Sequence, residues 1–383
     1  MHRLTTTSLA FIALAGLPLA PARAADFKIG TVLSLTGGGA DIGKYLIEGA
    51  KTAVTLVNER GGIGGMHVDM IVCDTQTVEQ QAVLCARKLL FDDKVDMLMG
   101  AGTTPQTQAI LPTIAQAGVP SFALAGATIN FRPLKKWVFK MLATNEDQIP
   151  AALDYFKAKG MKTIADIRDN GPFGADIAAN LKKAAADDGM TIVDEELYTQ
   201  SDTDFTAQVT HVREKRPDVI FDMSSNPPPG ALIAKKIYEL GMKQPIVVGV
   251  NLQTKAVVDL AGPAAPQILY IGYKAVASGE SGDNPLAANL NAFKAVFEKV
   301  NPGAEVNGLS VTCADPIIIT EAAAKNLGAK ALDHEALLNA LQSIKDVPGI
   351  QGYWTYTPTS HESSLKSGIE LLRYENGEWV AAK

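Results

Sequence analysis

The feature that most limits the fold of this chain is an alternation of short apolar runs with stretches of helical periodicity. The runs KIGTVLSL (28–35), VDMIVCD (68–74) and VDMLMG (95–100) each precede such a stretch. Strands separated by helices at this spacing form a parallel sheet through right-handed crossovers. The predicted fold class is therefore α/β, with helices flanking a mostly parallel sheet.

The same alternation begins a second time after Asn145. The runs TIADIRD (163–169), DVIFDMS (218–224) and PIVVGVN (245–251) again alternate with helical stretches. Two halves with one pattern indicate two lobes of like topology, which suits a chain of 383 residues.

The remainder of the chain does not form a third unit and is expected to dock on the two lobes. Within it, IELLRYENGEWV (369–380) predicts a hairpin that turns at Asn376-Gly377. The predicted division is 25–144 plus 275–351 for lobe 1 and 145–274 plus 352–383 for lobe 2. Docking of this remainder on both lobes implies several crossings between them.

The first 24 residues have the composition of a signal peptide. A basic start at His2 and Arg3 precedes the apolar run from Leu9 to Leu19, and small residues lead up to Ala24. An apolar core of about 11 residues is too short to span a bilayer but suits a secretory signal. We expect cleavage after Ala24 and a soluble periplasmic product. No cysteine lies near that position, so we expect no lipid anchor.

Composition and motif spacing argue against several classes of function. The chain has 35 Lys and Arg against 41 Asp and Glu, which provides no basic surface for nucleic acid. The five His are far apart, so no metal site or other cofactor is predicted. Gly38 to Lys44 has the spacing of a phosphate-binding loop, but Tyr45 stands where Ser or Thr should hold magnesium. No nucleophile motif occurs either, so we interpret the chain as a monomeric binding protein rather than an enzyme.

Two cysteines could form a disulfide. Cys73 ends a predicted strand, and Cys85 lies in the next helix. In such a unit their Cα atoms could come within about 6 Å, and export makes the bridge chemically possible. The alternative is that both are small buried hydrophobic residues.

Hydroxyl side chains follow two neighbouring strands where those strands end. Thr103 and Thr104 lie in GTTPQT (102–107), and Thr128 ends AGAT (125–128). Because parallel strands end at one edge of a sheet, these hydroxyls and the free amides of a helix N-terminus could bind a carboxylate. The alternative is that the threonines only cap helices.

An ordered set of motifs gives the chain a family resemblance. KIGTVLSLTG, AVLCARKLL, KVDMLMGAGTT, AGVPSFALAGAT, DNGPFGADIA and RPDVIF occur in the order found in one group of proteins. The chain resembles the branched-chain amino-acid type of periplasmic solute-binding protein, the extracytoplasmic subunit of ABC importers. The resemblance implies a type I fold with three crossovers between the lobes, which we expect near 143–145, 270–274 and 351–354. It also implies closure of the two lobes around a small ligand, and membrane permease and ATPase partners. A sensor that presents the closed form to a signalling partner is the alternative.

The resemblance also implies a set of ligand-binding positions. The family's carboxylate-binding positions are Thr104, Ala127 and Thr128 here, and its covering aromatic is Phe173. The family's acid that holds the ligand ammonium corresponds to Asn251. The other counterparts are Ile42, in place of an aromatic, and the loop containing Ser225 and Asn226.

Asn251 stands where the family has a carboxylate side chain. Its absence favours an aromatic acid over an amino acid as the ligand, since an unpaired ammonium in a closed cleft is costly. The ring of the aromatic acid would lie against Phe173 and Ile42, and Asn251 or Ser225 could meet a ring hydroxyl. Arg168 is either a second carboxylate contact or a surface residue at a strand end. Asp166 or Asp169 could replace the missing acid, which keeps amino acids and amides open as ligands.

Overall fold

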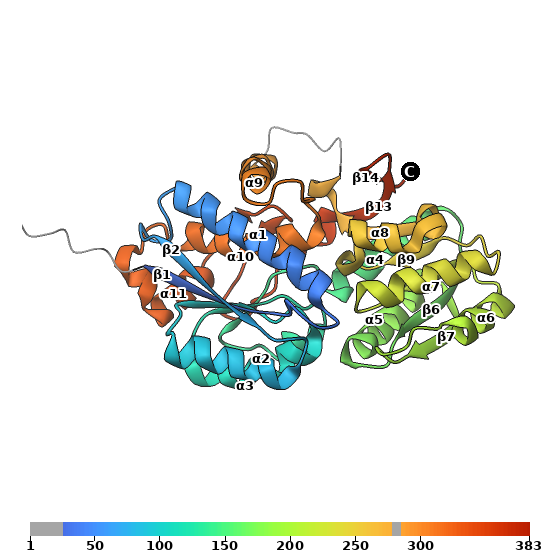
Figure 1. The fold of residues 1–383 in the computed structure, drawn as a ribbon, viewed down its shortest axis with the longest axis horizontal. Helices are drawn as coiled ribbons and strands as arrows, with labels where there is room; N and C mark the ends of the chain where they lie inside the picture. Colours follow the sequence, from blue (N-terminus) through green and yellow to red (C-terminus); the bar gives the residue numbers. More distant parts are fainter. Residues whose placement is uncertain (1–25, 278–284) are drawn as a thin grey trace, which may run out of the picture.

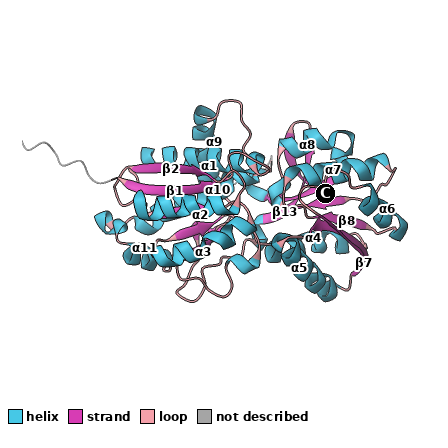
Figure 2. Cartoon of the chain, turned by 60° about the horizontal axis from the view of Figure 1, so that its bottom comes forward, coloured by secondary structure: helices cyan, strands magenta, loops and turns pink. Residues whose placement is uncertain are grey.

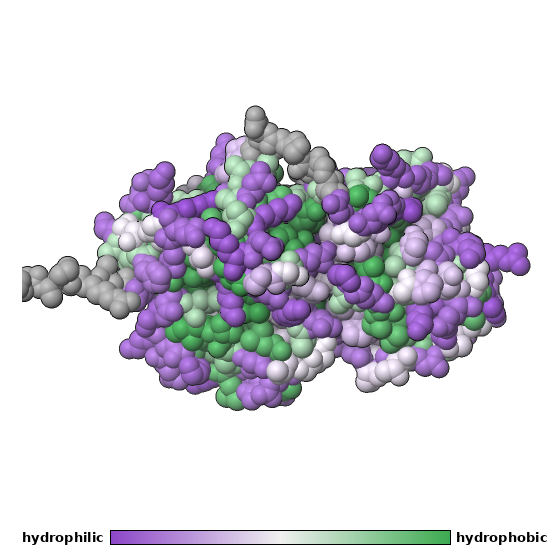
Figure 3. Space-filling view, turned by 45° about the horizontal axis from the view of Figure 1, so that its top comes forward, coloured by the Kyte–Doolittle hydropathy of each residue, from purple (hydrophilic) through white to green (hydrophobic). Residues whose placement is uncertain are grey.

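The computed structural model describes residues 26–277 and 285–383, so the expected signal peptide lies outside the described residues. Two lobes lie side by side, each with a β-sheet between helices (Figure 1). The face of the molecule seen in Figure 3 mixes hydrophilic residues with apolar areas on both lobes. Among the helices of the described segments, none combines the length and apolarity needed to cross a membrane.

Lobe 1 contains a five-stranded parallel sheet in the order β2-β1-β3-β4-β5. Its helices α1 and α10 pack on one face of the sheet, and α2 and α3 pack on the other (Figure 1). The strands are β1 (Phe27–Leu33), β2 (Val68–Asp74), β3 (Met97–Gly100), β4 (Ser121–Ala123) and β5 (Val138–Lys140). The helices are α1 (Ala40–Glu59), α2 (Glu79–Arg87), α3 (Thr104–Ala117), α9 (Pro285–Val300), α10 (Gly308–Ala324) and α11 (His334–Leu341).

Lobe 2 repeats this topology, because its parallel strands follow the equivalent order β7-β6-β8-β9-β10. The strands are β6 (Thr163–Asp169), β7 (Thr191–Tyr198), β8 (Val219–Asp222), β9 (Ile246–Val248) and β10 (Ile268–Tyr273). The helices are α4 (Asn145–Ala158), α5 (Pro172–Asp188), α6 (Thr206–Lys215), α7 (Pro227–Glu239) and α8 (Lys255–Ala261). The two sheets are seen on either side of the junction in Figure 2. The predicted α/β architecture of two like lobes is confirmed.

The predicted C-terminal hairpin extends the second sheet. Strands β13 (Ile369–Glu375) and β14 (Glu378–Ala381) pair antiparallel, and β13 adds antiparallel to β10. Asn376 and Gly377 have φ values of 52° and 88°, which a two-residue type I′ turn requires. The turn prediction is therefore confirmed.

The segment before this hairpin, predicted with lobe 2 from residue 352, makes its contacts with lobe 1. Strand β12 (Tyr353–Trp354) pairs with β11 (Val347–Pro348), and the backbone N–H of Lys140 donates to the His361 carbonyl over 2.9 Å. The rings of Tyr356 and His361 pack on Phe139 of β5. The third crossing between lobes therefore follows His361, later than the predicted 351–354.

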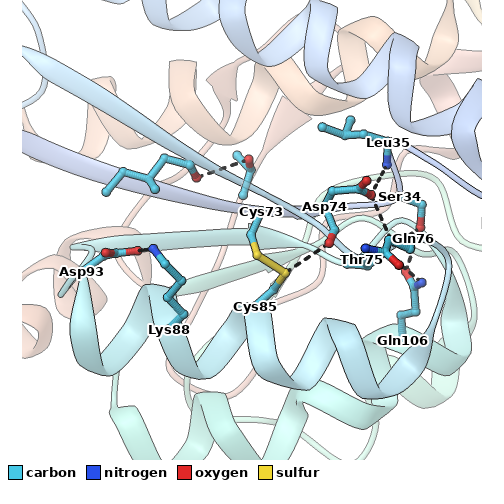
Figure 4. The surroundings of a disulfide bond; sticks show 12 residues. Ser34, Leu35, Cys73, Asp74, Thr75, Gln76, Cys85, Lys88, Asp93 and Gln106 are labelled. Carbon is cyan, nitrogen blue, oxygen red and sulfur yellow. Dashed lines mark hydrogen bonds and ion pairs between the residues drawn. A yellow bond between two sulfur atoms is a disulfide. The ribbon is translucent and has the colours of Figure 1, made fainter.

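Cys73 and Cys85 are joined in a disulfide that ties the end of β2 to α2, with Cα atoms 5.6 Å apart (Figure 4). Directly after it, the Asp74 carboxylate accepts the backbone N–H groups of Leu35 and Thr36. Thr75 shares a buried hydrogen-bond network with Ser34 and Gln106. The bridge therefore anchors the loop that supports the entry to α1.

Replacing both cysteines, Cys73→Ala with Cys85→Ala, is expected to lower the free energy of unfolding by about 3 kcal/mol. The reason is that the bridge closes a 12-residue separation and so restricts the unfolded chain. Urea unfolding with and without dithiothreitol measures the effect. Reductant should destabilise the parent by a similar amount and leave the double variant unchanged. A parent protein that is equally stable in reductant would contradict the prediction.

Candidate functional site

A cavity lies between the lobes where the parallel strands end. It leaves about 710 Å³ of space not filled by atoms, its open mouth included. Its wall is built from residues that follow β3, β4 and β5 of lobe 1 and β6, β7, β8 and β9 of lobe 2. Carboxyl ends of parallel strands are where α/β proteins bind ligands. The residues used in the argument below are Ile42, Thr103, Thr104, Leu124, Leu142, Gln148, Asp169, Phe173, Ser225, Asn226, Asn251 and Leu309.

The lobe 1 wall carries the Thr104 hydroxyl. Thr104 is the first residue of α3 and is 2% exposed, and its Oγ1 has no hydrogen-bond partner among the described residues. Thr103 is the N-cap residue, yet its side chain makes no capping hydrogen bond. Helix N-termini also present backbone N–H groups that lack intrahelical acceptors. The N-terminus of α3 therefore offers hydrogen-bond donors to an anion bound in the cavity.

The lobe 2 wall carries acceptors instead. Asp169 ends β6, and its Oδ1 accepts the Gly171 N–H over 2.9 Å. Its Oδ2 is buried without a partner in the described part of the chain, as is the side-chain oxygen of Asn226. Burial raises the pKa of the Asp169 carboxyl, with hydrogen bonds such as the one from Gly171 opposing the rise. A cation in the cavity would relieve the cost of keeping this carboxylate charged.

The side-chain amide of Asn251 is hydrogen-bonded to the loop after β8. Its Nδ2 donates to the carbonyl oxygens of Ser224 and Ser225 over 2.9 and 3.0 Å. A carboxylate at this position could not donate and would face two carbonyl oxygens. The amide therefore holds the loop after β8, which explains why an acid does not occupy this place.

The structure brings together most, but not all, of the residues predicted for the site. Seven line the cavity: Ile42, Thr103, Thr104, Phe173, Ser225, Asn226 and Asn251. Ala127 is fully buried outside the lining, and Thr128 bonds to Asp176 from lobe 2. Arg168 is not in the lining either, because its guanidinium pairs with Asp166 and Glu195 within lobe 2.

The alternation of side chains along β6 separates the two candidate acids. Asp166 and Arg168 point to one side of the strand and pair with each other, while Asp169 points to the opposite side. Asp169 is the acid that lines the cavity. This distinction follows from the period-2 pattern and could have been predicted from the sequence.

Gln148 is a cavity residue that the sequence analysis missed. It lies in the first turns of α4, just beyond the first crossing, and its Nε2 donates to the Ala143 carbonyl over 2.8 Å. Its Oε1 accepts the Val250 N–H over 3.0 Å. Both ends of its amide are therefore used to join the crossing to the loop after β9. No local sequence signal marks such a role.

Comparison with known proteins identifies the family. A model of the periplasmic binding proteins matches residues 26–377. The Leu/Ile/Val-binding protein BraC3 of Rhizobium johnstonii is 28% identical over 99% of this chain and 100% of its own length. The Leu/Ile/Val-binding protein homolog 3 of Brucella melitensis is 27% identical over 98% of both chains.

Solved structures share the fold. An extracellular ligand-binding receptor from Rhodopseudomonas palustris superimposes with a TM-score of 0.85 at 24% identity, covering 94% of this chain and 100% of that one. The branched-chain amino acid transporter substrate binding protein LivJ from Streptococcus pneumoniae, in complex with isoleucine, gives 0.79 at 23% identity, covering 94% and 99%. The chain therefore belongs to the periplasmic binding proteins, and it shares the two-lobed fold of these solved structures.

Proposed function

We propose that this protein is the extracytoplasmic substrate-binding subunit of an ABC importer and that it captures an amino acid with an apolar side chain. The observation that carries the proposal is the division of unpaired polar atoms in the cavity. Lobe 1 contributes the Thr104 hydroxyl, and lobe 2 contributes the free oxygens of Asp169 and Asn226. A donor on one wall and two acceptors on the other suit a ligand with both a carboxylate and an ammonium group.

The charge of the cavity favours a zwitterion over a plain acid. The described residues that line it include the carboxylate of Asp169 but no Lys, Arg or His. A plain carboxylate ligand would therefore add a like charge to a partly desolvated site without a cation to offset it. An α-ammonium beside Asp169 neutralises that charge, so the aromatic acid favoured by the sequence becomes the second choice.

The apolar part of the wall suits a hydrocarbon side chain. Phe173 reaches the cavity from lobe 2, while Ile42, Leu124, Leu142 and Leu309 reach it from lobe 1. A leucine-sized side chain buried there would gain roughly 1.5–3 kcal/mol. The names of the full-length relatives as Leu/Ile/Val-binding proteins support the same ligand class.

Calorimetry with matched ligand pairs tests the proposal. One pair is L-leucine and 4-methylpentanoate, which has the same skeleton without the ammonium, and the other is L-phenylalanine and 3-phenylpropanoate. We expect an amino acid to bind more tightly than its deaminated partner. Tighter binding of both plain acids would overturn the proposal and restore the aromatic or organic acid interpretation.

Thr104→Ala is expected to weaken binding of the preferred amino acid about tenfold or more, since a hydrogen bond to a charged group is worth roughly 1.5–3 kcal/mol. The melting temperature without ligand should change little, because the hydroxyl makes no capping bond. Thr104→Ser keeps the hydroxyl and should bind like the parent. A variant that melts lower but binds normally would show that Thr104 only supports the helix.

A further inference from the structure

A hydrogen-bonded contact between the lobes lies outside the ligand cavity, at Asp176 of α5. Its Oδ1 accepts the backbone N–H of Thr128 over 3.0 Å and the Thr128 hydroxyl over 2.6 Å. Thr128 belongs to lobe 1, where it begins a 3-10 turn (Thr128–Asn130) after β4. We propose that Asp176 acts as a latch, a side chain whose hydrogen bonds stabilise the closed lobes. Thr128 is then the residue that donates to this latch and not a ligand-binding residue.

The latch carboxylate is oriented by its own lobe. Asp176 Oδ2 accepts Nδ2 of Asn145, the first residue of α4, over 2.9 Å and Nδ2 of Asn180 over 3.2 Å. Asn180 is fixed in turn, since the same nitrogen donates to the Asp176 carbonyl over 2.8 Å. Asn180 Nδ2 also donates weakly to the Thr128 hydroxyl over 3.5 Å. Separation of the lobes therefore breaks these bonds to Thr128 and leaves the bonds from Asn145 and Asn180 to Asp176 in place. Such preorganisation lowers the entropy cost of forming the contact.

Thr128 cannot serve the latch and a ligand carboxylate at the same time. Its backbone N–H and its hydroxyl each carry one hydrogen, and both are directed at Asp176 Oδ1. A ligand carboxylate could use Thr128 only by displacing the Asp176 carboxylate. The inference rests on the proposed function in that it assumes closure around a ligand, but it does not depend on which ligand binds.

Scattering by the ligand-free protein tests the latch without any assumption about the ligand. We expect Asp176→Ala and Thr128→Ala to increase the radius of gyration of the full-length mature chain by shifting the population toward open lobes. Thr128→Ser keeps both hydrogens and should behave like the parent. Asp187→Ala removes an exposed carboxylate from the same helix, where it pairs with Lys183, and should change nothing. Profiles of Asp176→Ala and the parent that superimpose would overturn the proposal.

A double-mutant cycle with L-leucine as the probe separates a latch from a ligand contact. For a latch, each single variant should bind about tenfold more weakly, and the double variant should be no weaker than either single one. If Thr128 instead binds the ligand carboxylate, Asp176→Ala should bind as tightly as the parent or more tightly, and that result would refute the latch. If L-leucine does not bind the parent protein, the proposed ligand class fails, while the scattering result still decides the latch.

Discussion

Asp169→Asn is expected to reverse the ligand preference of this protein. Asparagine keeps an oxygen that can accept the Gly171 N–H, so the turn after β6 should survive the change. It removes the negative charge next to the cavity, however, and leaves a bound ammonium without its counter-ion. Breaking a buried charge pair in this way costs roughly 3–5 kcal/mol. We expect L-leucine to bind at least a hundredfold more weakly.

The same substitution should strengthen binding of the deaminated ligand. For 4-methylpentanoate, the loss of Asp169 removes a like charge from the cavity, so its affinity should rise while that of L-leucine falls. Calorimetry of both ligands with parent and variant measures the two opposite changes. A loss of affinity for both ligands would indicate general damage to the site. Unchanged affinity for L-leucine would show that Asp169 does not contact the ammonium.

The architecture could be predicted from the sequence because its signals are local. The six apolar runs identified in the sequence coincide with β1, β2, β3, β6, β8 and β9, and the alternation of strand and helix repeats in the second half. The Asn376-Gly377 turn has its own backbone requirement, which few other residue pairs meet. The segment containing Tyr356 and His361 lacks such a pattern. Its place beside β5 depends on ring packing against Phe139, which is a contact between distant parts of the chain.

The candidate site was predicted less completely, because it depends on contacts between the lobes. Thr104 and Thr128 are equivalent in the sequence, since each is a hydroxyl residue after a strand of the same sheet. In the structure, Thr104 faces the cavity with a free hydroxyl, whereas Thr128 bonds to Asp176 of the other lobe. No sequence pattern shows that Asp176 lies opposite Thr128. The role of the Asn251 amide likewise depends on the position of the loop after β8.

A buried acid behind the lobe 2 wall should make the stability of the protein depend strongly on pH. Asp222 ends β8 and is fully buried. Its Oδ1 accepts the Ser224 hydroxyl over 2.6 Å, while its Oδ2 has no partner among the described residues. Burial raises the pKa of this carboxyl from 3.8 to about 8, because the charged form loses its hydration. The folded protein therefore keeps Asp222 protonated at pH values where the unfolded chain has released the proton.

Asp222→Asn is expected to remove this dependence. Because the folded pKa is the higher one, the stability linked to Asp222 is fully present below about pH 4 and is lost as pH rises through about 8. Between about pH 4 and about pH 8, the unfolding free energy of the parent should fall by about 1.4 kcal/mol per pH unit relative to that of the variant. Asparagine keeps the oxygen that accepts from Ser224 and carries no charge.

Urea unfolding of the parent and of Asp222→Asn at pH 5, 6 and 7 measures the difference. The control Asp187→Asn, at an exposed site on α5, should run parallel to the parent. A constant difference between parent and Asp222→Asn over this range would mean that Asp222 is already ionised in the folded protein.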